Sequence, residues 1–169
     1  MISGAERIDQ PYSGEYTERI YDIDTSCHSS DWTWIKFFDD DEVWCGNFRG
    51  KYKGVVVSEK MGIAVVLTSD HLYVLDVFTA DIVDFIAQSN YVDITITPFG
   101  DILVTDGYDI EKFTHNRISD FELISTPIKT EFVRFKGWDG NVLKISCNEF
   151  LIYDELELKW DCVLEEWIS

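Results

Sequence analysis

The sequence predicts an all-β domain made of antiparallel meanders, arranged either like a propeller or as an open stack, with at most one short helix. Three observations favour this fold class. From residue 32 onward, short runs of β-branched and aromatic residues follow one another. Tight turn signals separate these runs. The chain also resembles itself when it is aligned at an offset of 39 residues.

Thirteen runs are candidate strands, and their neighbours in sequence are rich in turn-forming residues. These runs cover 33–38, 42–48, 53–58, 63–68, 71–77, 91–97, 101–105, 109–113, 119–124, 130–136, 141–146, 149–153 and 157–164. The turn signals lie at Ser69-Asp70, Pro98 to Asp101, Asp106-Gly107 and Asp139-Gly140.

One segment, "TADIVDFIAQ" at 79–88, predicts the single short helix. Its apolar residues Ile82, Phe85 and Ile86 recur at helical spacing. Thr79 or Asp81 could cap its N-terminus, because both side chains accept hydrogen bonds from backbone N–H groups.

The self-alignment predicts three copies of one unit, each a meander of three strands. Its columns are Val55/Ile94/Val133, Val65/Val104/Leu143 and Val74/Phe113/Ile152, with Gly62/Asp101/Gly140 in a shared turn. A single meander cannot bury its apolar face, so the copies must pack on one another. The period is close to the ~40–45 residues of a propeller blade, but closed propellers need about four blades or more. Residues 32–50 could supply a degenerate fourth copy, and whether the stack closes stays open.

The domain organisation predicted is an N-terminal wrapping segment, residues 1–31, followed by a single β domain, residues 32–169. The first segment is polar and shows little apolar periodicity. Tryptophans concentrate near the two ends of the β domain, which predicts that these ends pack together. Trp138, in the turn "KGWDGN", is the tryptophan most expected to be exposed.

Charge narrows the range of partners. The chain carries 32 acidic and 14 basic residues, a net charge of −18. Such a protein repels nucleic acid and anionic membranes, and it attracts basic proteins. Solubility alone is the other explanation of the charge. The sequence shows no apolar stretch of membrane-spanning length and no apolar leader at its start, so a cytoplasmic location is expected.

No arrangement of residues predicts catalysis, a metal or a cofactor. The acidic run Asp39-Asp40-Asp41-Glu42 lacks the alternating spacing of a calcium loop, and neighbouring side chains of an extended chain point to opposite faces. Three histidines are isolated and four cysteines lack zinc spacing, so the cysteines are expected to be reduced and mostly buried. The protein is therefore predicted not to be an enzyme.

The acidic clusters are instead candidate contact surfaces. One is the run 39–42, which could equally be a solvated turn, and the other lies in "YDELELKWDCVLEEW". If the two ends pack together, both clusters form one negative surface. The predicted partner-binding residues are Asp39, Asp40, Asp41, Glu42, Trp138, Asp139, Asp154, Glu155 and Glu157. The basic islands "RGKYKG" and "RFKG" are expected to be charge-paired surface.

Three stretches, "VWCGNFRGKYKGVVVSEKMGIAVVLTSDHLYVLD", "ITITPFGDILVTDGYDIEKF" and "VRFKGWDGNVLKISC", resemble the small, acidic, β-rich immunity proteins of bacterial toxin–immunity systems with contact-dependent or type VI delivery. The resemblance covers roughly residues 32–160 and rests on structural turns, so it carries over no functional residue. It implies a cytosolic protein that binds a cognate toxin, with a basic active-site cleft, and masks that site. Two alternatives stay open: a propeller-like recognition module for a peptide or carbohydrate, and a self-assembling structural protein.

Overall fold

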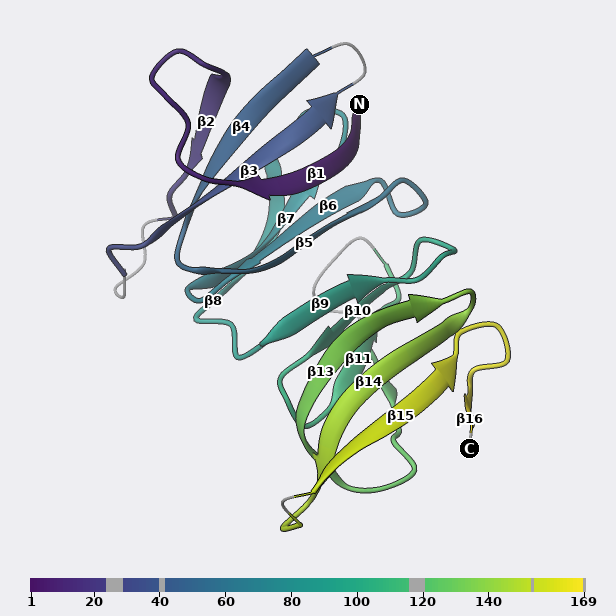
Figure 1. The fold of residues 1–169 in the computed structure, drawn as a ribbon. Helices are drawn as coiled ribbons and strands as arrows, with labels where there is room; N and C mark the ends of the chain where they lie inside the picture. The colour runs from purple at the N-terminus through teal and green to yellow at the C-terminus, as the bar shows by residue number, and fades with distance from the viewer. Residues whose placement is uncertain (24–28, 40–41, 116–120, 153, 169) are drawn as a thin grey trace.

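Four four-stranded sheets follow one another along the chain and stack in a row (Figure 1). The structure is a computed structural model that describes residues 1–23, 29–39, 42–115, 121–152 and 154–168. Within these residues every regular element is a strand, and the sheets form an open stack. The predicted all-β, mainly antiparallel fold class is therefore confirmed.

The first sheet has the strand order β1-β3-β4-β2 and uses the N-terminal residues. It contains β1 (Ile2–Ile8), β2 (Thr17–Tyr21), β3 (Trp32–Asp39) and β4 (Glu42–Arg49). β1 pairs with β3 and β3 with β4 in antiparallel fashion, whereas β2 pairs with β4 in parallel.

The other three sheets are antiparallel meanders in which each strand pairs with the next. The second sheet contains β5 (Tyr52–Ser58), β6 (Ile63–Thr68), β7 (His71–Asp76) and β8 (Ile82–Ala87). The third contains β9 (Asp93–Ile96), β10 (Ile102–Thr105), β11 (Ile110–Phe113) and β12 (Phe121–Ile124). The fourth contains β13 (Thr130–Asp139), β14 (Val142–Glu149), β15 (Glu155–Asp161) and β16 (Glu166–Ile168).

The meanders have four strands where the sequence predicted three. The first two columns of the self-alignment do fall in the first and second strands of each meander. Ile152 of the third column, however, precedes β15, so the 39-residue alignment no longer matches equivalent strands in the last copy. The internal repeat itself stays a prediction.

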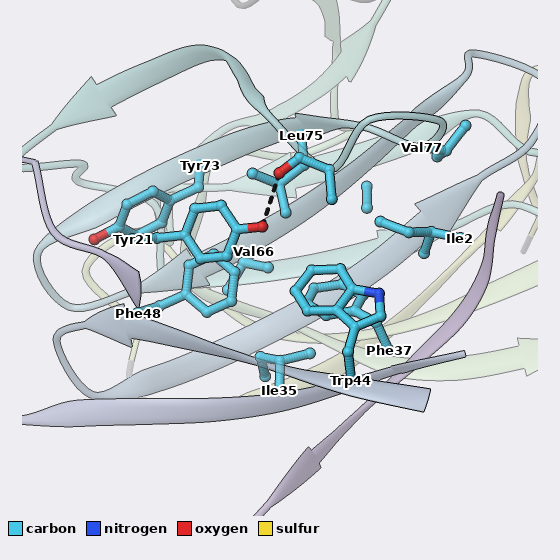
Figure 2. Packing of buried hydrophobic residues seen from close by; sticks show 12 residues of the cluster. Ile2, Tyr21, Ile35, Phe37, Trp44, Phe48, Val66, Tyr73, Leu75 and Val77 are labelled. Carbon is cyan, nitrogen blue, oxygen red and sulfur yellow. Dashed lines mark hydrogen bonds between the residues drawn. The ribbon is translucent and has the colours of Figure 1, made fainter. Parts of the chain in front are cut away.

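One apolar cluster lies between each pair of neighbouring sheets. The cluster between the first and second sheets is rich in aromatic rings: Tyr21 stacks on Phe48 with centroids 4.5 Å apart, and Phe37 stacks on Trp44 at the same separation (Figure 2). Ile63, Val65, Val74 and Ile102 centre the second cluster, and Leu103, Ile145 and Trp160 centre the third. Because β6 and β7 are covered on both faces, they are buried almost throughout.

Backbone contacts hold successive sheets at close range. Ile2 N–H donates to the carbonyl of Val77 at 2.7 Å, and Val133 N–H donates to the carbonyl of Gly107 at 2.9 Å. A Cβ atom on Gly54 would lie 2.3 Å from Ile94 Cγ2, so β5 approaches β9 closely only because residue 54 is glycine. The sheets are thus fixed to one another by main-chain bonds as well as by apolar packing.

The two ends of the β domain do not pack together, which corrects the prediction from the tryptophans. Trp44 belongs to the cluster between the first and second sheets, whereas Trp138, Trp160 and Trp167 pack between the third and fourth. The labelled termini lie at opposite ends of the stack (Figure 1). Trp44 fills one inter-sheet space, and Trp138, Trp160 and Trp167 fill another, so the positions of tryptophans in the sequence do not indicate closure.

The predicted helix at 79–88 is wrong. Residues 82–87 form β8, which pairs with β7 and completes the second sheet. Its Ile, Val and Phe residues have strong β propensity, and an isolated helix this short gains little in water. The turn before it is capped by Asp76, whose carboxylate accepts the N–H groups of Phe78 and Thr79 at 2.8 and 2.9 Å.

Three further local predictions differ from the structure. Residues 2–8 and 17–21, expected in an irregular wrapping segment, form β1 and β2. Residues 166–168 form the unpredicted strand β16. Of residues 149–153, expected as a strand, Glu149 ends β14 and 150–152 follow in a turn closed by Ile152 N–H and the carbonyl of Glu149, whereas residue 153 lies outside the described residues. The division into segments 1–31 and 32–169 stays a prediction.

Candidate partner-binding surfaces

The acidic run lies where β3 turns into β4. Asp39 ends β3 and Glu42 begins β4, and the two are cross-strand partners; Asp40 and Asp41 lie outside the described residues. Asp39 pairs with the N-terminal ammonium group of Met1. Arg19, whose guanidinium lies 5.1 Å from the ring centroid of Trp44, lines a shallow hollow with Asp39 and Glu42. Two cations therefore offset part of the negative charge at this hairpin.

The second acidic cluster lies at the end of the fourth sheet where β14 turns into β15. Asp154, Glu155 and Glu157 are all exposed. Glu157 meets Lys159 only at 3.8 Å, and within the described residues Asp154 and Glu155 form no ion pair. These carboxylates keep their charge available to a partner.

Exposed apolar side chains share this end of the sheet. The exposed fractions are 63% for Phe132, 74% for Leu151 and 47% for Ile152. Phe132 and Leu151 also have positive φ angles, 55° and 66°, which are strained conformations for bulky residues. We call this surface the acidic–apolar tip, defined as Phe132, Leu151, Ile152, Asp154, Glu155 and Glu157. Large exposed apolar groups beside carboxylates that are unpaired or only weakly paired are typical of a protein-binding surface.

Trp138 and Asp139 lie at the other end of the fourth sheet, where β13 turns into β14. Trp138 is half-buried rather than exposed, and its indole N–H donates to Thr95 Oγ1 at 2.9 Å. Asp139 pairs with Lys144 at 3.0 Å. Both residues have local structural partners; a role in binding stays a prediction for each.

The single negative surface expected from the two acidic clusters is not formed. Asp39 and Glu42 belong to the first sheet, and Asp154, Glu155 and Glu157 lie at the fourth, the other end of the stack (Figure 1). A partner would meet these clusters as separate surfaces.

The basic island "RGKYKG" is engaged within the chain, whereas within the described residues Arg134 of "RFKG" donates to the carbonyl of Val133 and Lys136 is exposed. Arg49 pairs with Asp22, Lys51 lies 3.8 Å from Asp31, and Lys53 donates to the carbonyl of Tyr91 at 2.6 Å. Burial, with Arg134 nearby, lowers the pKa of Lys53. "RGKYKG" therefore tightens contacts between sheets and loops and presents little free positive charge.

The groups that could carry chemistry are dispersed. Across the described residues, no three His, Cys, Asp or Glu side chains group around a point where an ion could sit. Cys45 and Cys147 are buried and Cys162 is half-buried. Burial raises the pKa of the Cys45 thiol to about 11, so this thiol stays protonated and unreactive at neutral pH.

A further surface escaped sequence analysis: an aromatic cleft of about 380 Å³ on the first sheet. Trp32 and Trp34 line it and alternate along β3 with the buried residues Thr33 and Ile35, so their rings point away from the core. The other lining residues are Gln10, Pro11, Ser13, Glu18, Ile20 and Asn47. The sequence signal for this cleft is the pair of tryptophans two positions apart on one strand. In sequence analysis, these tryptophans were instead interpreted as packing between the two ends of the domain.

The chain matches no protein-family model and no curated protein sequence. Among the described residues, no helix is long and apolar enough to cross a membrane. Any function must therefore be argued from the surfaces themselves.

Proposed function

We propose that this protein is a non-catalytic neutraliser of a basic protein, of the kind formed by bacterial immunity proteins and their cognate toxins. It binds the toxin in the cytoplasm and masks a positively charged active-site cleft. The observation that carries the proposal is the acidic–apolar tip, where exposed apolar side chains lie beside carboxylates that lack strong partners.

The physical argument combines two contributions to binding. Exposed carboxylates with at most one weak ion pair, on a chain of net charge −18, accelerate encounter with a basic surface. Phe132, Leu151 and Ile152 supply apolar area that becomes buried on contact, and burial of such area supplies most of the affinity of protein complexes. Phe132 and Leu151 have strained backbone conformations, and such strain is concentrated at functional sites of proteins.

The test is co-expression with the toxin-like protein encoded beside this gene, followed by association kinetics of the purified pair. We expect the protein to restore growth, and we expect association to slow as salt rises. Asp154→Asn, Glu155→Gln and Glu157→Gln together should reduce the association rate by about tenfold.

The matched control removes the same charge elsewhere, through Glu59→Gln, Asp81→Asn and Asp109→Asn, all exposed on the second and third sheets. This control should associate nearly as fast as the natural protein at physiological salt. Unchanged protection and salt-independent association of the tip variant would overturn the proposal.

A peptide-recognition or carbohydrate-recognition module is the second candidate function. The aromatic cleft on the first sheet is the observation that favours it, because clefts of this size with tryptophan walls and a few polar groups commonly bind ligands.

A further inference from the structure

The two outer faces of the stack differ in kind. On the fourth sheet, Lys144 alternates with Leu143 and Ile145, which face the core, and it pairs across the sheet with Lys159. This terminal face is therefore charged, as expected of an end that meets only water. On the first sheet, the outward positions of β3 hold Trp32 and Trp34, followed by Lys36, which pairs with Glu6. An aromatic terminal face indicates contact with a ligand or partner.

The aromatic cleft is already ordered for binding. The guanidinium of Arg49 lies 3.9 Å from the ring centroid of Trp32, and Arg49 is itself held by Asp22. Stacking of this kind fixes a ring in place. Ile20, 69% exposed, is the cross-strand partner of Asn47 and widens the apolar floor of the cleft. Preorganised walls reduce the entropy lost when a ligand binds.

The polar groups of the cleft define what would complement it. Within the described residues, the indole N–H groups of Trp32 and Trp34 donate no hydrogen bond, whereas those of Trp138 and Trp167 donate to Thr95 and Ser125. Glu18 accepts from Asn47 at 2.8 Å and keeps further acceptor capacity for a cation. The cleft thus offers free donors and a carboxylate, and its ligand needs free acceptors and a positive charge.

We propose that the aromatic cleft binds a proline-rich segment in the polyproline II conformation that carries a lysine or arginine. Such a segment has no internal hydrogen bonds, so its carbonyl groups are free to accept from the two indoles. Its proline rings pack on aromatic walls, a recurrent mode of peptide recognition. The basic side chain meets Glu18 in the field of a strongly acidic protein. Pro11 of the chain itself already lines this cleft, so a prolyl ring suits its surface.

A saccharide complements the cleft less well. Its hydroxyl groups can accept from the indoles and donate to Glu18, but an uncharged sugar carries no cation to pair with Glu18 and gains nothing from the net charge of the protein. This inference rests on the second candidate function, and it is independent of toxin neutralisation through the acidic–apolar tip.

The experiment is calorimetric titration of the full chain with four synthetic probes. These are a polyproline peptide ending in arginine, the same peptide ending in glutamate, a glycine–serine peptide ending in arginine, and a neutral oligosaccharide. We expect the first probe to bind at least about tenfold more tightly than each of the others, with weakening at higher salt.

Three variants locate the site. Trp34→Ala should weaken binding of the arginine-ended polyproline by about tenfold or more. Glu18→Gln, a conservative change at an exposed position, should abolish the preference for arginine over glutamate and leave polyproline binding in place. Phe78→Ala removes an apolar side chain, 71% exposed, from a different sheet connection, and it should leave affinity unchanged.

Absence of polyproline binding up to about 1 mM, or binding unaffected by Trp34→Ala, would overturn the inference. Tighter binding of the oligosaccharide would replace it with a sugar site. A negative result for peptide binding would not alter the effect of the tip variants on toxin association. Either proposal can therefore be wrong without the other.

Discussion

Asp93 illustrates how a single half-buried carboxylate links two sheets. It lies on β9 of the third sheet, and its two oxygens accept the N–H groups of Ile94 and Phe135, each at 2.9 Å. Phe135 belongs to β13, so this carboxylate satisfies a backbone donor of the fourth sheet. Burial raises the pKa of Asp93, although both hydrogen bonds oppose this effect.

The raised pKa makes the stability difference between Asp93→Asn and the natural protein depend on pH. As the pH rises past about 4, the unfolded state loses its proton before the folded state does, so ionisation of Asp93 lowers the free energy of unfolding. Asparagine does not ionise. The free energy of unfolding of Asp93→Asn, relative to that of the natural protein, should therefore increase as the pH rises from about 4 to 7. Urea unfolding at several pH values in this range measures this difference. Asp109→Asn, at an exposed turn, controls for the lost charge. A difference that stays constant would contradict this assignment.

At the scale of elements, the strands that the sequence did not predict are stabilised mainly by pairing with neighbouring strands. β1 and β2 show almost no apolar periodicity, yet β3 and β4 offer free edges to which they bond. β8 was mistaken for a helix because Ile82, Phe85 and Ile86 recur at helical spacing, although burial alternates along the strand. An unpaired edge is a strong template for any extended segment nearby.

If β1 is part of the core, Ile2→Ala should markedly lower the free energy of unfolding. Ile2 is fully buried between the first and second sheets. We expect a loss of about 2–4 kcal/mol in the free energy of unfolding, because a buried isoleucine leaves a cavity. Ser3→Ala, at the exposed neighbouring position, should change stability by less than about 0.5 kcal/mol. An equally small effect at Ile2 would restore the view of this segment as a loosely attached arm.

At the scale of the whole molecule, the excess of acids dominates the surface. Ion pairs engage many of the cations in the described residues: Lys36 with Glu6, Arg49 with Asp22, Lys51 with Asp31, Lys60 with Asp101, Lys112 with Glu165, Lys144 with Asp139 and Lys159 with Glu157. With 32 acidic against 14 basic residues, the carboxylates far outnumber the cations that could pair with them. Their mutual repulsion disfavours the compact state.

Salt should therefore stabilise this protein. Raising ionic strength from about 0.01 M to 0.15 M shortens the Debye length from about 30 Å to 8 Å and screens the repulsion between acids. Each kcal/mol of repulsion relieved should raise the Tm by about 2–4 °C for a chain of this size. Sodium chloride and choline chloride should act alike, because screening does not depend on the identity of the cation. A Tm that falls with salt would show that the ion pairs contribute more than the repulsion costs.

Local sequence determined the all-β class and the approximate positions of strands β3 to β7 and β9 to β15, because propensity and turn chemistry act within a few residues. It also determined the charge that makes a basic partner the natural expectation. Tertiary structure alone decided the open stack, the added strands β1, β2, β8 and β16, and the separation of the two acidic clusters. It also placed Trp32 and Trp34 on an outer face while burying Trp160. The physical reason is that strand pairing and sheet stacking depend on edges and faces supplied by distant parts of the chain, and a local pattern does not record which partner will cover them.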